Sequence, residues 1–260
     1  MPALPSLSHL LLMLPIGAAL GFCGGLFGIG GGIIAIPLLA LGFGMTQPLA
    51  HGTALVLMVP NLLVAWWRYQ RLHPVAWRAV AAIGVTAMAT TWLLARTATR
   101  LDPHVLRGLF CAGLFLLSLR MLRARPTETT THASADLNVR LLPVVGALGG
   151  TSMGLLGIGG GLVATPLLSG WMRQRQTVAQ SLALALVAPS SVVALATYAS
   201  AERVDWSLGL PLAIGGLLTV SAGVSLAHRL PEARMRRAFA WMLLCTTLWL
   251  GLAPLLTGHA

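Results

Sequence analysis

Charged side chains are scarce in this 260-residue chain, since Asp, Glu, Lys and Arg together make up only 9% of it. Soluble globular domains carry roughly a quarter charged residues, so this scarcity excludes an ordinary soluble protein. Hydrophobic residues make up 57% of the chain. They form successive apolar runs of about 18 or more residues, the length that crosses a hydrocarbon core as a helix. The composition therefore predicts an all-α polytopic membrane protein.

Acidic residues are especially few, and each of the six falls in a predicted loop. They are Asp102, Glu128, Asp136, Glu202, Asp205 and Glu232. Because none lies inside an apolar segment, a proton relay of carboxylates or a cation site with carboxylate ligands is disfavoured. An anionic or neutral substrate fits this chain better.

Lysine is absent, and the 17 basic residues are arginines at the ends of apolar segments. Arginine in that position anchors a span at the membrane interface, so the net charge of +11 does not indicate nucleic-acid binding. Cys23, Cys111 and Cys245 lie in apolar segments without CxxC spacing, which indicates core residues rather than a disulfide or a metal site. We expect no metal, no cofactor and no nucleic-acid partner; the expected partners are the lipid bilayer and a small anionic substrate.

A glycine-rich stretch occurs twice. Residues 21–39 recur 129 positions later as residues 150–168, with twelve of the nineteen positions identical. The offset continues without a gap over about ninety residues, pairing for example Gln47 with Gln176 and Pro60 with Pro189. Self-similarity of this kind predicts that the two halves share one fold.

We expect about eight transmembrane helices, arranged as two four-helix repeats. Residues 1–122 form the first repeat, 123–140 a polar linker and 141–260 the second repeat. Each repeat contains a Gly-rich broken or half-crossing helix, because the apolar piece 33–43 after the glycines would span only about 16 Å as a helix. Four spans and a half-crossing element make the repeats parallel, whereas five full crossings would invert them. The length favours the first alternative, in which the arginines divide eight to nine between the two sides and set no orientation.

Glycine runs suit an anion site for a physical reason. Non-helical backbone at membrane depth must be covered by protein or by a water-filled cavity. A helix that begins there presents free amide groups and a partial positive charge to an anion, and discontinuous helices at a repeat interface often mark a transporter's binding site. The glycines also fit small-xxx-small spacing, which packs helices closely without binding anything. Pro37 and Pro166 disfavour one continuous packing helix.

The candidate substrate-binding residues fall into two groups. The glycine breaks contribute Gly28, Gly30, Gly31, Gly32 and Pro37 in the first repeat and Gly157, Gly159, Gly160, Gly161 and Pro166 in the second. The next long span contributes His51, Thr53 and Asn61, with Gln180, Ser181 and Ser190 at or beside the equivalent positions. These polar side chains either hydrogen-bond within the helix bundle or line the substrate path as neutral donors. Neither an HExxH, a GxSxG nor a P-loop pattern is present, so we do not expect an enzyme.

At these residues the chain resembles the TauE/SafE family of sulfite exporters, which is also grouped with toluene-sulfonate uptake permeases. The resemblance rests on the duplicated Gly-x-Gly-Gly-Gly-x4-Pro-Leu-Leu, the Pro60-Asn61 step, the ends Tyr69 to Trp77 and Tyr198 to Trp206, and the segments around Arg107 and Arg236. It implies a multi-pass transporter of the bacterial inner membrane for sulfite, sulfonates or related anions. The second copy has Gln180 and Ser190 where the first has His51 and Asn61, so we expect the two half-sites not to be equivalent.

The hypothesis from the sequence is a secondary carrier that binds a small sulfur-containing anion between the two glycine breaks and alternates access by rocking the repeats. A passive anion channel is the alternative. Saturation and exchange of labelled substrate distinguish a carrier from a pore.

Overall fold

The computed structural model describes residues 7–27, 30–72, 74–123, 139–157, 159–172, 174, 176–227 and 240–250. In these ranges the regular structure is helical, and they contain no strand. Residues 124–138 of the expected linker lie outside the described residues, as does Gly28 of the first glycine run.

The first half begins with α1 (Leu7–Phe27) and α2 (Gly32–Pro37), and α2 continues into the π-helical turn η1 (Leu38–Gly42). Three long helices follow: α3 (Gln47–Leu72), α4 (Trp77–Ala98) and α5 (Pro103–Arg123). Apolar side chains predominate in all of them.

The second half repeats this order. The 3₁₀ turn η2 (Val139–Leu141) leads into α6 (Leu142–Leu156), and α7 (Gly161–Pro166) continues into the π-helical turn η3 (Leu167–Trp171). Then come α8 (Gln176–Ser200), α9 (Trp206–Ala227) and the helix Ala240–Leu250. Five helices of the described chain are long and apolar enough to cross a membrane: Gln47–Arg71, Trp77–Ala98, Val139–Leu156, Val178–Ser200 and Trp206–Leu226.

The first helix of each half packs closely against a helix of the other half. A Cβ atom added at Gly21 of α1 would lie 2.3 Å from the Cα of Gly216 in α9, and one added at Gly150 of α6 would lie 2.4 Å from the carbonyl oxygen of Ala87 in α4. Glycine at these positions lets the backbones touch. The Thr91 hydroxyl of α4 donates to the Gly150 carbonyl at 3.0 Å across the second of these contacts.

These contacts also reveal the helix directions. Along α6, Gly146 meets Ile83 and Gly154 meets Thr91, so α6 runs parallel to α4. Likewise, Gly17 meets Leu212 and Gly25 meets Val220, so the residue numbers rise together along both helices and α1 runs parallel to α9.

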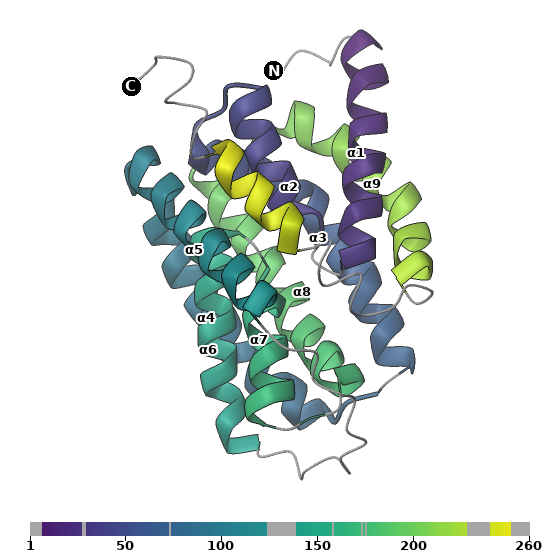
Figure 1. The fold of residues 1–260 in the computed structure, drawn as a ribbon, viewed down its shortest axis with the longest axis vertical. Helices are drawn as coiled ribbons and strands as arrows, with labels where there is room; N and C mark the ends of the chain where they lie inside the picture. The colour runs from purple at the N-terminus through teal and green to yellow at the C-terminus, as the bar shows by residue number, and fades with distance from the viewer. Residues whose placement is uncertain are drawn as a thin grey trace.

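The start of α3 lies at the end of α8, where the Asp205 amide donates to the Thr53 hydroxyl at 3.0 Å. Therefore α3 and α8 are antiparallel, and short turns reverse the chain between α3 and α4 and between α8 and α9. Helices related by the 129-residue offset consequently run in opposite directions, as Figure 1 shows for α1 and α6.

The parallel arrangement that the length of the short element favoured is therefore wrong. Since α1 runs in the same direction as α3, the piece between them, α2 with η1, must return to the side from which α1 came (Figure 1). The pair α1 and α2–η1 is a hairpin. Three long helices, α3, α4 and α5, follow it, so the next half of the chain begins in the opposite direction.

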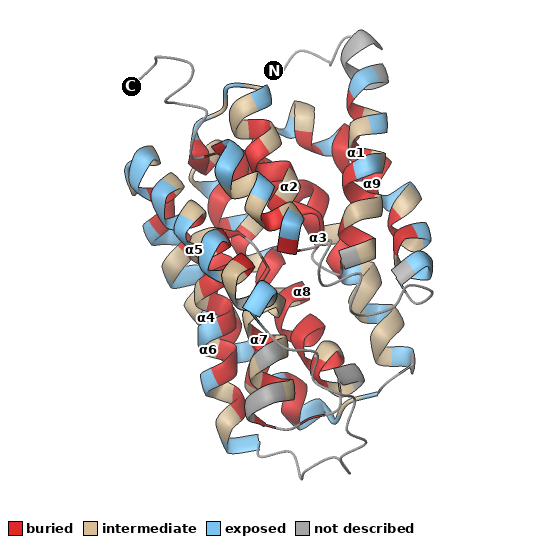
Figure 2. Ribbon diagram, in the orientation of Figure 1, coloured by how far each residue is buried: buried red, intermediate tan, exposed pale blue. Residues whose placement is uncertain are grey.

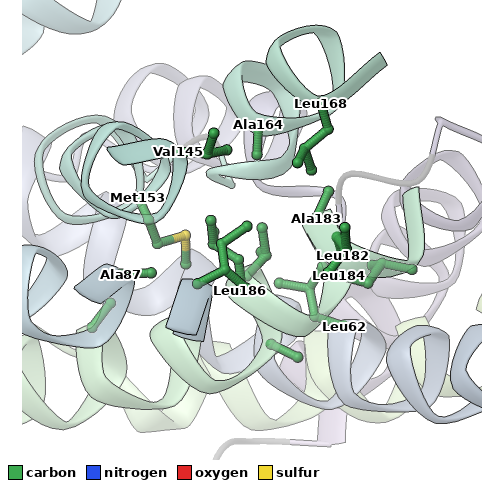
Figure 3. Packing of buried hydrophobic residues seen from close by; sticks show 14 of the residues in the cluster. Leu62, Ala87, Val145, Met153, Ala164, Leu168, Leu182, Ala183, Leu184 and Leu186 are labelled. Atoms are coloured by element: carbon green, nitrogen blue, oxygen red, sulfur yellow. The ribbon is translucent and has the colours of Figure 1, made fainter. Parts of the chain in front are cut away.

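Buried side chains form two hydrophobic cores, visible as red bands in Figure 2. The α4–α8 core joins α4, α6, α7 and α8 with one face of α3, and Figure 3 shows side chains from each of these elements meeting around Leu186. The α1–α9 core joins α1, α2, α5, α9 and the helix Ala240–Leu250 with another face of α3. Each core thus combines helices from both halves of the sequence.

Candidate functional site

Glycines with positive φ interrupt the helices in both halves. Between α1 and α2, Gly30 and Gly31 have φ of 69° and 89°. After α6, Gly157 and Gly159 have φ of 64° and 78°. Only glycine adopts these conformations at little cost, so the glycine run is what ends α1 and α6 and lets α2 and α7 start in new directions.

The first break lies midway along α3. A Cβ atom on Gly30 would touch the Leu62 side chain at 3.0 Å, and one on Gly31 would lie 2.8 Å from the Leu20 carbonyl oxygen and 3.6 Å from Leu57. In the second half, a Cβ atom on Gly160 would lie 2.8 Å from Leu186, midway along α8. Both breaks therefore lie in the buried interior.

The two breaks touch each other. A Cβ atom added at Gly32, the first residue of α2, would lie 3.2 Å from the carbonyl oxygen of Gly157. One added at Gly157 would lie 3.3 Å from Ile36 of α2 and 3.6 Å from the His51 ring. The start of α2, the end of α6 and His51 of α3 thus meet at one place, which we call the junction.

One face of α3 carries polar side chains towards the interior. At about 100° per residue, Gln47, His51 and Asn61 fall within an arc of about 80°. His51 and Asn61 are each 1% exposed and Gln47 is 4% exposed. Within the described chain, no hydrogen-bond partner is found for either ring nitrogen of His51, either amide atom of Asn61 or Nε2 of Gln47.

His51 connects the two hydrophobic cores. Its ring centroid lies 5.2 Å from that of Phe110, whose side chain belongs to the α1–α9 core, and 6.3 Å from that of Tyr198, which belongs to the α4–α8 core. The Tyr198 hydroxyl reaches the Gly154 carbonyl at 3.5 Å. The junction is therefore lined by an imidazole, two aromatic rings and glycine backbone.

Ser190 is the counterpart of Asn61 in α8. It is fully buried, and among the described atoms its hydroxyl has no partner. Its neighbour Ser191 is also fully buried, but the Ser191 hydroxyl donates to the Ala188 carbonyl at 2.7 Å. Ser190 therefore resembles Asn61 in being a buried polar group that the fold does not use.

Several of the residues expected in the site do not contact the junction or have another role in the structure. Thr53 accepts the amide of Asp205 and so ties α3 to the turn before α9, which is a structural role. Ser181 is buried, about 100° around α8 from the half-buried Gln180. Pro37 is buried at the end of α2, and Gly161 has room for a Cβ atom, the nearest atom being 3.5 Å away on Val187.

Three residues near the junction were not identified from the sequence as site residues. Gln47 shares the face of α3 that carries His51, and Phe110 and Tyr198 lie beside the His51 ring. The spacing of Gln47 and His51, four residues apart on a helix, was a signal that could have identified the first. Phe110 and Tyr198 come from distant helices, so no local pattern pointed to them.

Two of the three carboxylates that the structure describes, Asp102 and Asp205, cap helices at the turns. The Asp205 carboxylate accepts the amides of Ser207 and Leu208 at the start of α9, at 2.9 and 3.2 Å. Asp102 accepts the His104 amide at 2.8 Å at the start of α5. Such caps satisfy helix N-terminal amides. The polar groups at the junction are accordingly neutral donors and acceptors.

The chain is similar in sequence to known membrane transporter proteins. The family model described as Sulfite exporter TauE/SafE matches residues 13–250. A probable membrane transporter protein of Xylella fastidiosa is 27% identical over 251 residues, which cover 94% of this chain and 95% of that protein. One from Haemophilus influenzae is 25% identical over 261 residues, covering 91% and 96%. The chain belongs to the TauE/SafE sulfite exporter family, a family of membrane transporters.

Proposed function

We propose that this protein is a secondary carrier that binds a small sulfur-containing anion, such as sulfite, a sulfonate or sulfoacetate, at the junction between the two glycine breaks. The observation that carries the proposal is that His51, Asn61 and Ser190 are among the buried polar side chains for which the described chain supplies no partner. A buried polar group without a partner costs about 1–3 kcal/mol. The oxygen atoms of an anion would accept hydrogen bonds from the donors among them, which are an imidazole N–H, a carboxamide NH₂ and a hydroxyl.

The chemistry of the junction suits an anion without requiring a cationic side chain. At the junction the neutral imidazole of His51 offers one N–H donor. The carboxamide of Asn61 offers two and lies ten residues, or about 15 Å, further along α3. The start of α2 at Gly32 adds backbone amides with the partial positive charge of a helix N-terminus. Phe110 and Tyr198 would contact an apolar substituent on the sulfur.

Burial favours a carrier over a passive channel. His51, Asn61 and Ser190 are at most 1% exposed, so an anion reaches them only after helices move. Alternating access requires such a closed state, whereas an open pore would keep its polar lining in contact with water. Transport should therefore saturate and show exchange of labelled anion.

The two hydrophobic cores are the bodies that would move. Helices α1 and α9 are locked by backbone contacts at Gly21 and Gly216, and α4 and α6 by those at Gly150 and Ala87. Each locked pair takes one helix from each half, so the bodies that rock are the α1–α9 core and the α4–α8 core rather than the two halves of the sequence. His51, between Phe110 and Tyr198, lies where they would separate.

We place the eight helices as two inverted four-helix repeats in a bacterial inner membrane. The arginines of the described residues support an orientation. On the side where α3 ends, the described helices carry six: Arg68, Arg71, Arg78, Arg120, Arg123 and Arg140. The opposite side carries four: Arg96, Arg100, Arg107 and Arg203. Six against four favours a cytoplasmic position for the side where α3 ends.

The test is counterflow in vesicles that contain the purified protein, with labelled sulfite, sulfoacetate and taurine as separate probes. A carrier exchanges internal anion for labelled external anion and saturates. The variant His51→Leu should lose this exchange, whereas His104→Leu, at an exposed position of α5, should retain it. Flux that rises linearly with concentration without exchange would support the channel, and full exchange by His51→Leu would refute the site.

A further inference from the structure

Gln47 is the first residue of α3 and lies one helical turn before His51. It is 4% exposed, and its Nε2 has no hydrogen-bond partner in the part of the chain that the structure describes. The turn before it is open to solvent, since Gly44 and Thr46 are exposed. Gln47 therefore lies between a solvent-exposed turn and the buried His51, about 6 Å from it along the helix axis.

A second glutamine on the same helix shows what a structural role looks like. Gln70, near the opposite end of α3, donates through Nε2 to the Val75 carbonyl at 3.2 Å and so closes the turn into α4. Gln47 has the same side chain but holds no neighbour through Nε2. Gln47 lies on the helix face that also carries His51.

We propose that Gln47 is an additional anion-binding residue, which holds the substrate on its way between the external side and His51. Two donors one turn apart on a helix face lie about 5–6 Å apart at their Cβ atoms, so one small anion with several oxygen atoms can contact both. This inference rests on the proposed carrier function.

Because of its position, Gln47 should affect the binding of anion that arrives from one face of the membrane only. It lies at the end of α3 that meets the turn Arg203–Asp205, as the contact of Gly52 with Arg203 shows, whereas Asn61 and the first break lie deeper along α3. Anion arriving from that side meets Gln47 first. Anion arriving from the arginine-rich side reaches the junction without passing it.

The experiment measures half-saturating concentrations for sulfite and sulfoacetate in right-side-out and inside-out membrane vesicles. The Gln47→Leu variant removes the donor at similar volume and should raise the value about tenfold for anion added at the external face. The value at the cytoplasmic face should change less than about twofold. Gln70→Leu is the matched control and should leave both values unchanged. Thermal unfolding of Gln47→Leu without anion should occur no earlier than in the original protein, because no native hydrogen bond of Nε2 is lost.

Three outcomes would overturn the inference. Unchanged values at both faces, or an equal rise at both, would refute an external position for the anion. Earlier unfolding with unchanged values would make Gln47 a structural residue. Loss of exchange in His51→Leu together with an unaffected Gln47→Leu refutes this inference alone, whereas full exchange in both variants refutes the carrier site itself.

Discussion

The adjacent serines of α8 allow a sharp test of whether the unpartnered polar groups exist for a ligand. Ser190 and Ser191 are both fully buried. Ser191 donates to the Ala188 carbonyl at 2.7 Å, and Ser190 has no partner among the described residues. The change Ser→Ala at each position removes one oxygen atom from the same helix.

The expected effects on stability have opposite signs. At Ser190 the change removes a desolvated hydroxyl, which costs about 1–3 kcal/mol, and leaves only a small void, so Ser190→Ala should raise the free energy of unfolding by about 1 kcal/mol. At Ser191 the change removes a hydrogen bond from the side chain to the backbone of the same helix, worth about 0.5–1.5 kcal/mol. Ser191→Ala should therefore lower the free energy of unfolding by a similar amount.

The effects on the anion should also differ. A hydrogen bond to a charged group is worth about 1.5–3 kcal/mol, so Ser190→Ala should weaken anion binding by about tenfold or more. Ser191→Ala should leave the affinity unchanged. The measurements are thermal unfolding in detergent with and without sulfite or sulfoacetate, and counterflow in vesicles.

If Ser190→Ala raises the free energy of unfolding and lowers the affinity for the anion, the Ser190 hydroxyl is there to bind the ligand. If Ser190→Ala instead lowers the stability and keeps the affinity, the hydroxyl is a structural group and the argument from unpartnered atoms fails. If both variants behave alike, burial without a partner carries no information about the site.

Three further predictions follow from the packing. Thr53→Val leaves the Asp205 amide without its acceptor and should lower the free energy of unfolding by about 1–3 kcal/mol. The anion affinity, measured in a thermal-shift titration, should stay unchanged. A large loss of affinity would contradict the structural role of Thr53. Gly161→Ala should fold normally, because its Cβ atom has 3.5 Å to Val187, whereas Gly160→Ala would place a Cβ atom 2.4 Å from the Gly149 carbonyl oxygen and should reduce the yield of folded protein. The third prediction uses single cysteines introduced into a chain that lacks its own three. Thr46→Cys and Glu202→Cys should react with a membrane-impermeant thiol reagent from the same face of the membrane, and Pro74→Cys from the other face. Labelling of Thr46→Cys and Glu202→Cys from opposite faces would instead support parallel repeats.

Local features of the sequence were sufficient for the helical class and for singling out the glycine runs and His51, which meet at the junction. Long apolar runs predict helices that cross a membrane regardless of how they pack. Glycine runs predict a break because positive φ is a property of the residue itself, and Gly30, Gly31, Gly157 and Gly159 have it. Buried polar residues such as His51 and Asn61 stand out because so few polar residues occur in the long helices.

The tertiary structure decided what depends on distant contacts. Whether the eleven-residue element α2–η1 continues in the direction of α1 or turns back cannot be determined from its length. This one choice reverses the helix directions of the second half relative to the first. The roles of neighbouring polar residues also depended on it, since Thr53 found a partner 152 residues away and His51 did not. The glycine spacing was compatible with close helix packing and with helix breaks, and the structure contains both. Gly21 and Gly150 touch the backbones of other helices, whereas Gly32 and Gly157 meet at the junction. The physical reason is the same in each case: a side chain's type determines which bonds it can make, and only the fold determines which partner is within reach.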